Sequence, residues 1–245
     1  MRLALSWLTV LPVGTPVDVG FDAARRALYW APVVGAALGL LAAGLLAGLH
    51  VLGAPPLLAG LIVVATLAGC TRAMHLDGLA DTADGLGCYG GAQRALEVMR
   101  DGSCGPFAVI ALVLVLTTQA AALGTLGHTG RLIPVVLALI AGRAAFSWCA
   151  RRGVPAARPV GLGMLVAGSQ PVAVPVAWFA ILLAGGLLAV PGRAWQGTLA
   201  VAVAALAVVA FCAHTNRRLG GVTGDVLGAT SELTTTIILT VCAVA

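Results

Sequence analysis

Seven long apolar runs follow one another along the sequence, and they constrain its fold more than any other feature. They lie at residues 31–53, 56–73, 106–127, 132–150, 172–190, 197–214 and 226–245. Each run is close to the ~20 residues that an α-helix needs to cross the hydrocarbon core of a bilayer. Only 9% of the residues are charged, against about 25% in water-soluble domains. The sequence therefore predicts an all-α, polytopic integral membrane protein with about seven transmembrane helices, forming one domain over residues 1–245.

The N-terminus predicts a short helix at the membrane surface. Residues 1–12 are mostly apolar and carry one arginine, but the run is too short to span a bilayer. No small-residue cleavage site follows it, as a signal peptide would require. Arg25, Arg26 and Trp30 then indicate a membrane boundary, because positive charge and aromatic rings collect at the headgroup level. We expect an interfacial or re-entrant helix ahead of the first span.

Two pairs of glycines recur at helical spacing in the first apolar run. They are Gly35-x-x-x-Gly39 and Gly44-x-x-x-Gly48. Small residues four apart let two helix backbones approach closely inside a membrane. The alternative is chance spacing, since the chain contains 32 glycines.

Arginine is unevenly distributed between the two sets of connecting segments. All 14 basic residues are arginine. Twelve occur on alternate loops or near the span ends beside them: Arg2, Arg25, Arg26, Arg72, Arg94, Arg100, Arg143, Arg151, Arg152, Arg158, Arg217 and Arg218. The opposite loops carry only Arg131 and Arg193. Because loops rich in positive charge remain in the cytoplasm, the asymmetry predicts that the N-terminus and the segment from His75 to Gly105 face the cytoplasm.

The composition also excludes several function classes. A chain without lysine has neither a Walker-type phosphate loop nor a Schiff-base lysine. The net charge of +5 follows from the arginine asymmetry, so we expect no nucleic-acid partner. The six cysteines contain no C-x-x-C pair, which indicates small buried side chains.

An acidic segment between the second and third runs differs from the rest of the chain. Asp77, Asp81 and Asp84 are spaced i, i+4, i+7, so on a helix they share one face within about 60°. Carboxylates on one face repel one another unless a cation lies between them, and oxygen ligands suit Mg²⁺ or Mn²⁺. The pattern predicts a metal site. The alternative is a solvated polar face.

The position of this segment decides whether charged carboxylates are tolerated there. If the helix of residues 57–73 continues, the three aspartates emerge at the cytoplasmic mouth of the span. Asp101, at the mouth of the next span, can then close the site from a neighbouring helix. Glu97 can pair with Arg94 or Arg100. For His75, a hydrogen-bonded position at a helix interface is favoured over metal ligation.

Two further polar clusters suggest phosphate contacts. Gly220 to Asp225 reads G-G-V-T-G-D and follows Arg217 and Arg218. A glycine-rich turn before a helix can present backbone N–H groups to phosphate, and arginine can grip phosphate oxygens. The alternative is a helix C-cap followed by a turn. Arg158, within A-R-P-V-G-L-G at 157–163, is either a substrate contact or a topology determinant.

Four segments together resemble the cobalamin synthase family. They are H-L-D-G-L-A-D-T-A-D-G at 75–85, M-R-D-x-x-x-G at 99–105, A-R-P-V-G-L-G at 157–163 and G-G-V-T-G-D-V-L-G-A at 220–229. The resemblance implies a Mg²⁺-dependent adenosylcobinamide-GDP ribazoletransferase of the bacterial inner membrane. Such an enzyme joins adenosylcobinamide-GDP to α-ribazole, or to its 5′-phosphate, and releases GMP.

The resemblance also assigns roles to individual residues. It implies Asp77, Asp81 and Asp84 as metal ligands, with Asp84 also catalytic, and we expect Asp101 to accept a proton. The remaining expected substrate-binding residues are His75, Arg94, Arg100, Arg158, Arg217, Thr223 and Asp225. The family often has arginine where this chain has Val10 and Ser103, so Arg94 and Arg100 are the nearest substitutes.

Two rival functions remain open at this point. A CDP-alcohol phosphotransferase motif begins D-x-x-D-G, as do Asp81 to Gly85, but its later aspartate pair is absent here. A cation transporter would place its carboxylates at the bilayer midplane. Membrane lipid is the expected surrounding, and a homo-oligomer is compatible with the sequence. On the metal assignment, Asp84→Asn is expected to abolish turnover without unfolding the protein.

Overall fold

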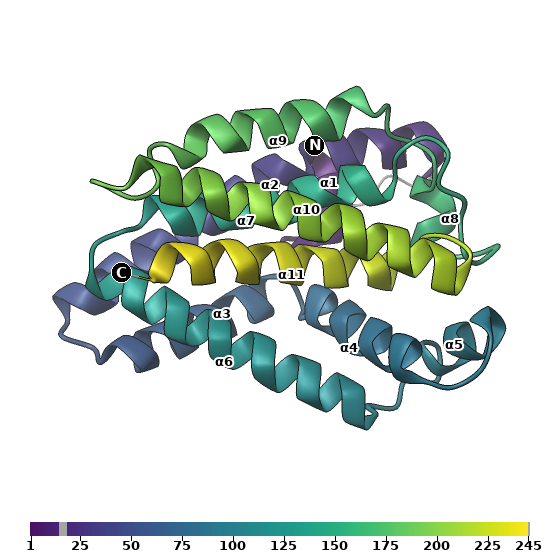
Figure 1. Ribbon diagram of the computed structural model, residues 1–245, viewed down its shortest axis with the longest axis horizontal. Helices are drawn as coiled ribbons and strands as arrows, with labels where there is room; N and C mark the ends of the chain where they lie inside the picture. Colours follow the sequence, from purple (N-terminus) through teal and green to yellow (C-terminus); the bar gives the residue numbers. More distant parts are fainter. Residues whose placement is uncertain (15–18, 245) are drawn as a thin grey trace.

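The computed structural model describes residues 1–14 and 19–244, which form helices joined by short loops (Figure 1). No strand occurs in these ranges. The helices are α1 (Arg2–Leu8), α2 (Phe21–Val51), α3 (Pro56–Cys70), α4 (Met74–Gly87), α5 (Ala92–Val98), α6 (Pro106–His128), α7 (Ile133–Cys149), α8 (Leu162–Val166), α9 (Ala173–Gly186), α10 (Ala194–Leu219) and α11 (Gly224–Ala243). The all-α fold class is confirmed, and α1 occupies the position of the expected N-terminal helix.

The seven apolar runs correspond to α2, α3, α6, α7, α9, α10 and α11. Four of these, α2, α6, α10 and α11, are long and apolar enough to cross a membrane. Helix α3 reaches that length only together with α4, while α7 and α9 are shorter apolar helices. The structure thus supports a multi-pass membrane protein, and the count of seven spans stays a prediction.

Helix α11 lies at the centre of the bundle, with α10 on one side and α3, α4 and α6 on the other (Figure 1). Within its most apolar window 67% of the residues are buried, against 33–44% for the other three long helices. This position explains its polar sequence, because its hydroxyls face protein instead of lipid. Thr230 and Thr234 each donate a hydrogen bond to the carbonyl four residues earlier, at 2.6 and 2.7 Å.

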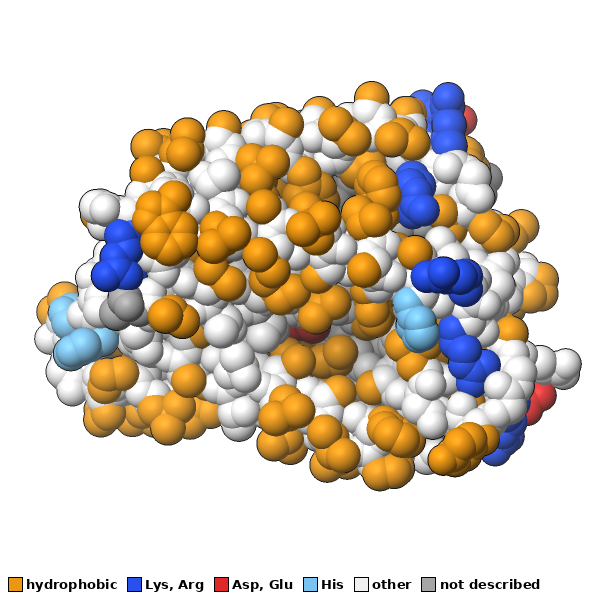
Figure 2. Space-filling model, in the orientation of Figure 1, with side chains coloured by type: hydrophobic (Ala, Val, Ile, Leu, Met, Phe, Trp, Pro, Cys, Tyr) orange, Lys and Arg blue, Asp and Glu red, His pale blue; other side chains and the backbone are white. Residues whose placement is uncertain are grey.

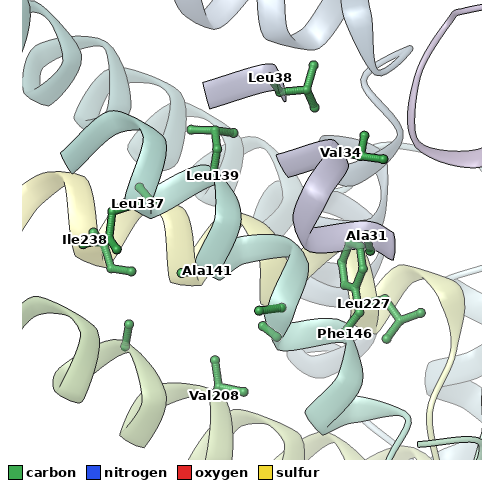
Figure 3. Close-up of a cluster of buried hydrophobic side chains, with 14 of the residues drawn as sticks. Ala31, Val34, Leu38, Leu137, Leu139, Ala141, Phe146, Val208, Leu227 and Ile238 are labelled. Carbon is green, nitrogen blue, oxygen red and sulfur yellow. The ribbon is translucent and has the colours of Figure 1, made fainter. Parts of the chain in front are cut away.

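The apolar core is built where α2, α7 and α11 meet (Figure 3). Val34 and Leu38 of α2 pack with Leu139 and Phe146 of α7, and all four side chains are buried. One of the two glycine pairs serves this interface. A Cβ at Gly39 would lie 2.8 Å from Val136 Cα, whereas one at Gly44 would meet nothing within 4 Å. The close-packing interpretation is therefore confirmed for the first pair and wrong for the second.

This difference gives a matched pair of variants in one helix. Gly39→Ala is expected to destabilise the protein by about 1–3 kcal/mol, because the added methyl must displace the α7 backbone. Gly44→Ala is expected to be neutral or stabilising by up to about 1 kcal/mol, because alanine favours helix over glycine. Thermal unfolding of both variants in detergent checks the contrast. Equal melting temperatures would contradict the α2–α7 packing described here.

The expectation of one continuous helix from residue 57 to the aspartates is wrong. Arg72 and Ala73 adopt left-handed backbone angles, with φ of 55° and 53°, and α4 departs from α3 at 93°. Two contacts from the N-terminal segment hold this break. Val10 N–H donates to Cys70 O at 2.8 Å, and the Arg72 guanidinium donates to Ser6 O at 3.1 Å. Because α4 turns away and carries three aspartates, we treat it as lying outside the membrane-spanning segments.

The two ends of the bundle carry different charge. Figure 2 shows arginine side chains gathered at the end that contains α4 and α5, with few at the other end. At that other end, His50 and His128 pack edge to face with ring centroids 5.7 Å apart. The C-terminal end of α11 also lies there (Figure 1). The arginine-rich loops predicted to share one side of the membrane therefore lie together at one end of the bundle, and the arginine-poor loops lie at the other.

Candidate active site

The site is organised by the crossing of α4 and α11, where glycine brings the two backbones into contact. A Cβ at Gly78 would lie 2.7 Å from the Asp225 carbonyl oxygen, and one at Gly228 would lie 3.1 Å from His75 Cα. A side chain at Gly78 would clash with the α11 backbone, and one at Gly228 would be in tighter than ordinary contact with α4. Gly78, in the segment 75–85, and Gly228, in the segment 220–229, therefore position the aspartates of these two segments beside each other.

Three carboxylates converge at this crossing, and we call Asp77, Asp81 and Asp225 the acidic cluster. Burial, followed by the charges of Asp225 and Asp77, raises the pKa of Asp81 to about 6. The Arg158 guanidinium opposes this rise, and Asp84 contributes least among the charges. Carboxylates that raise one another's pKa in this way are those that a cation would stabilise together.

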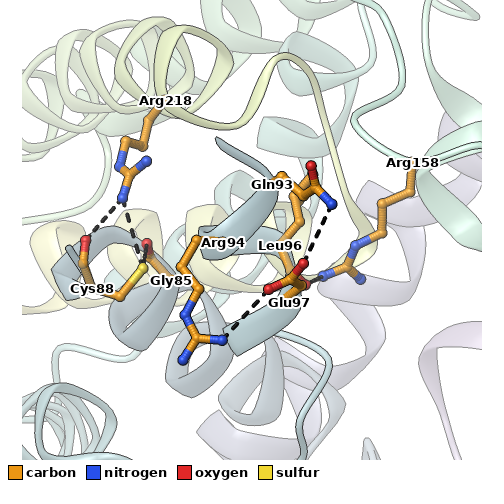
Figure 4. A network of polar contacts seen from close by, with 8 residues as sticks. All are labelled: Gly85, Cys88, Gln93, Arg94, Leu96, Glu97, Arg158 and Arg218. Carbon is orange, nitrogen blue, oxygen red and sulfur yellow. Dashed lines mark hydrogen bonds and ion pairs between the residues drawn. The ribbon is translucent and has the colours of Figure 1, made fainter. Parts of the chain in front are cut away.

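Asp225 was expected to bind substrate. In the structure, the third carboxylate beside Asp77 and Asp81 is that of Asp225, whereas the sequence pattern had predicted Asp84 in this place. Asp225 comes from the first turn of α11, 144 residues after Asp81. Arg158 Nη1 lies 3.4 Å from Asp225 Oδ2, and its Nη2 donates to Leu96 O at 3.0 Å. Arg158 thereby joins α5, the loop after α7 and α11 at one point. Figure 4 shows Arg158 beside Leu96 of α5.

Asp84 is directed away from the cluster toward the start of α6. Its Oδ2 accepts a hydrogen bond from Gly105 N–H at 2.6 Å, and its Oδ1 accepts one from Ala108 N–H at 3.0 Å. The side chain is buried. The first backbone N–H groups of a helix lack partners within it, so Asp84 satisfies two donors and fixes α4 against α6. Metal ligation by Asp84 stays a prediction.

Carboxylate oxygens at the acidic cluster suit Mg²⁺ chemically. Among residues 1–14 and 19–244, no group of three or more His, Cys, Asp or Glu side chains is arranged so that it could hold a metal ion, the three carboxylates of the acidic cluster included. Mg²⁺ does not require such a group, because it commonly binds through one or two carboxylates with substrate phosphates and water completing its shell. Asp77 is exposed and Asp81 is half-buried, and both are open to a cleft, which fits that mode of binding.

Two open clefts lie near the acidic cluster, one lined by α4 and the loop before α6, the other by α5 and the loop after α7. The acidic cleft has a volume of about 740 Å³ and is lined by Asp77, Asp81, Arg72 and the Gly102–Cys104 loop, among others. The arginine cleft has a volume of about 710 Å³ and is lined by Arg100, Asp101 and Arg158, among others. Each is large enough for a nucleotide-sized ligand.

The expected proton acceptor, Asp101, is exposed on the arginine cleft. Its Oδ2 accepts a hydrogen bond from Ser103 Oγ at 2.7 Å. Asp101 lies two residues before Ser103, which lines the acidic cleft, so this loop connects the two clefts. Arg94 pairs with Glu97 at 3.5 Å (Figure 4), one of the two partners expected for Glu97. Arg100 remains on the cleft wall without an ion-pair partner in the described ranges.

The glycine-rich turn before α11 serves as a cap. Gly220 ends α10 in the left-handed conformation with φ of 80°, which is the C-cap alternative. Thr223 begins α11, and its hydroxyl accepts a hydrogen bond from Val226 N–H at 3.2 Å. Arg218 donates to Cys88 O at 2.9 Å (Figure 4), while Arg217 bonds only to Ala213 O of its own helix. The turn thus positions Asp225. Of the two arginines that precede the turn, only Arg217 is exposed and could contact a phosphate group.

His75 is buried and lines neither of the two clefts. Its ring stacks on Phe146 at 5.7 Å with an interplanar angle of 12°. Neither ring nitrogen has a hydrogen-bond partner in the described residues. The hydrogen-bonded interface role expected for His75 is therefore wrong, although the interface position is right.

A polar group inside the bundle was missed by the sequence reasoning. Gln119 Nε2 donates to Glu232 Oε2 at 2.8 Å, and Arg143 is buried beside the same small cavity. Charged residues in apolar runs were the available signal, because such residues face the bundle interior. The sequence did not show that these three side chains meet.

Comparison with known proteins gives one consistent family. The profile described as Cobalamin-5-phosphate synthase matches residues 1–243. A relative from Nocardioides sp., named adenosylcobinamide-GDP ribazoletransferase, is 44% identical, with 95% of this chain and 93% of the relative covered. Relatives of the same name from Frankia casuarinae and Corynebacterium efficiens are 38% and 36% identical; each match covers 99% of this chain and 93% and 90% of the respective relatives. No solved structure matches this chain.

The glycines at the α4–α11 crossing and the aspartates beside them lie within the span of the family profile. The profile and the relatives extend over nearly every helix of the fold. The chain belongs to the cobalamin-5-phosphate synthase family.

Proposed function

We propose that this chain is an adenosylcobinamide-GDP ribazoletransferase. It joins adenosylcobinamide-GDP to α-ribazole, giving adenosylcobalamin and GMP, or to α-ribazole 5′-phosphate, giving the 5′-phosphate of the product. The observation that carries the proposal is the acidic cluster with Arg158, built at the α4–α11 crossing in a chain of this family.

The chemistry follows from the groups on the two clefts. A ribazole hydroxyl attacks the phosphorus attached to cobinamide, a new P–O bond forms, and the bond to GMP breaks. Asp77 and Asp81 would hold Mg²⁺, which supplies charge neutralisation for the diphosphate and for GMP as it leaves. Arg100 and Arg158 bind diphosphate oxygens. Asp101 accepts the hydroxyl proton and passes it to water.

We propose a direct displacement without a covalent enzyme intermediate. The chain has no lysine, and the residues that line the two clefts include no Ser–His or Cys–His pair. Phosphoryl transfer of this kind requires positioning and charge neutralisation more than a protein nucleophile.

We also propose that the clefts face the cytoplasm from the bacterial inner membrane. The arginine-rich end of the bundle supports this orientation, because positively charged loops remain in the cytoplasm. Nucleotide substrates are available on that side. The acidic cluster lies at one end of the bundle, and this argues against a transporter, whose carboxylates would lie near the middle of the spanning helices.

The test is GMP release by the purified protein in lipid nanodiscs. Release is expected only when adenosylcobinamide-GDP, α-ribazole or its 5′-phosphate, and Mg²⁺ are all present. A substrate made chiral at the cobinamide-linked phosphorus is expected to give inverted product. Net retention would refute direct displacement, and turnover of a CDP-alcohol or ion flux without GMP release would refute the proposed function.

A further inference from the structure

An apolar groove of about 280 Å³ lies where α9 packs against α7 and α10, and we call it the α9 groove. It is lined by Trp148 of α7, by five residues of α9 between Pro175 and Leu183, and by three residues of α10 between Ala205 and Val209. All of these side chains are apolar or aromatic. Figure 1 shows α9 at the edge of the bundle, and Val176 and Val209 in the groove are exposed. The groove is therefore part of the surface that faces membrane lipid.

The α9 groove begins near the arginine-rich end of the bundle and continues toward the middle. Helix α9 starts at Ala173, and the backbone just before it, at Gln170, is hydrogen-bonded to Arg152. From Pro175 to Leu183 the helix rises about 12 Å, somewhat less than half of the ~30 Å hydrocarbon core. The groove therefore reaches about as deep as one leaflet, which is the depth that a single acyl chain occupies.

Arg151 places a positive charge at this end of the groove. Its guanidinium carbon lies 4.6 Å from the centre of the Trp148 ring, which lines the groove, and its Nη1 donates to Trp148 O at 3.0 Å. No carboxylate among the described residues forms an ion pair with Arg151 or Arg152. Tryptophan and arginine together are typical of the headgroup level of a membrane. The groove thus combines an apolar wall with a cationic mouth.

Hydrogen bonds hold the loop that carries this arginine in place. Gln170 N–H donates to Ala150 O at 3.0 Å, and Arg152 N–H donates to Gln170 O at 2.8 Å. The buried side chain of Gln170 donates to Arg25 O of α2 at 3.1 Å. A cation whose backbone is already fixed loses less conformational entropy when a ligand binds. The mouth of the groove is therefore preorganised.

We propose that the α9 groove binds one anionic phospholipid, with an acyl chain along α9 and the phosphate at Arg151. Basic sites between membrane helices at the cytoplasmic side bind acidic headgroups in this way, and arginine is well suited to phosphate oxygens. A zwitterionic lipid brings its own ammonium group, which Arg151 repels. A second copy of this chain packed on the groove would take Arg151 out of water, and burying an unpaired charge is unfavourable. The site shares no residue with the two clefts.

Lipid retention by the unaltered protein gives a test that needs no variant. The protein is purified in detergent, mixed with equal amounts of dioleoyl phosphatidylglycerol and dioleoyl phosphatidylethanolamine, and examined by native mass spectrometry. The two lipids share their acyl chains, so the comparison isolates the headgroup. The first bound lipid is expected to be phosphatidylglycerol by about five-fold or more, since a basic residue at the membrane surface attracts acidic lipids to this extent.

Arg151→Gln removes the charge and keeps a polar side chain at the mouth of the groove. This variant is expected to retain phosphatidylglycerol about five-fold less than the unaltered protein, because the phosphate loses its cation. The matched control is Arg193→Gln, which makes the same change of charge at an exposed position on the arginine-poor end of the bundle. The control should keep the preference for phosphatidylglycerol.

A second pair of variants tests the apolar wall. Ala180 lines the groove and is exposed on α9, so Ala180→Trp fills the groove from a position that tolerates a large side chain. Retention of phosphatidylglycerol is expected to fall. Ala184→Trp is the control, because Ala184 is exposed one turn later on the same helix and does not line the groove.

Equal retention of the two lipids by the unaltered protein would overturn the proposal. The same conclusion would follow if Arg151→Gln kept the preference, or if Arg193→Gln lost it to the same extent. A dimer in the native mass spectra that Ala180→Trp dissociates would assign the groove to contact between copies of the chain and would also overturn lipid binding. None of these measurements uses GMP release, so their failure and that of the proposed function are distinguishable.

Discussion

Asp81→Asn is expected to lower turnover by at least about 100-fold without lowering the melting temperature. Replacing a group in the outer shell of a metal site typically lowers activity 10–100-fold, and a direct ligand should cost at least as much. Asp81 is only partly buried and lines an open cleft, so neutral asparagine is accommodated without steric change. If Asp81 holds Mg²⁺ as proposed, loss of the carboxylate would weaken Mg²⁺ binding and leave the diphosphate charge less neutralised.

The effect should depend on Mg²⁺ concentration. GMP release measured over a Mg²⁺ titration is expected to show a higher half-saturating concentration for Asp81→Asn. Asp22→Asn is the control for the change in charge, because Asp22 is exposed at the start of α2 and pairs only with Arg25, at 3.9 Å. Near-normal turnover of Asp81→Asn at limiting Mg²⁺ would show that the acidic cluster does not hold the metal.

Asp84→Asn is expected to destabilise the protein by about 2–3 kcal/mol, in contrast to Asp81→Asn. The Asp84 carboxylate accepts hydrogen bonds from two backbone N–H groups at the start of α6. Asparagine offers one acceptor oxygen, so its NH₂ group would face a buried N–H donor, and hydrogen bonds to a charged acceptor are worth about 1.5–3 kcal/mol each. This revises the sequence-based expectation that the variant stays folded.

Thermal unfolding in detergent, followed by circular dichroism, measures this difference. Asp101→Asn provides the comparison, because Asp101 is exposed and accepts only from the Ser103 hydroxyl. Its melting temperature should match that of the unaltered protein. If Asp84→Asn also melted normally yet lost all activity, Asp84 would act in the reaction and not in holding α6.

The sequence predicts what depends on local pattern. Apolar runs of spanning length predict the helices, and the arginine distribution predicts which loops lie together. Gly39 was identified as a packing position, but Gly44 has the same spacing and faces open space. Spacing alone cannot distinguish them, because the partner helix α7 begins at Ile133, far along the chain.

The site also differs from the sequence-based prediction because contacts between segments far apart in the chain decide where its side chains lie. The i, i+4, i+7 pattern grouped Asp84 with Asp77 and Asp81, since it describes one helix without its neighbours. The N-terminus of α6 recruits Asp84, and Asp225 replaces it from a distant helix. The break after α3 rests on Arg72 and Ala73, two residues with no special tendency toward the left-handed conformation. Contacts with Ser6 and Val10 hold it, and these could not be seen before the fold was known.

The division of the acidic cluster between α4 and α11 has a consequence for how the protein is made. Asp225 follows Asp81 by 144 residues, so α4 is synthesised before the residue that joins Asp77 and Asp81 in the acidic cluster. The close contact between Gly78 and the Asp225 backbone forms only when α11 takes its place at the centre of the bundle. A growing chain therefore carries most of its membrane helices before it has a complete site. We expect no activity from a chain that has not yet packed α11 against α4.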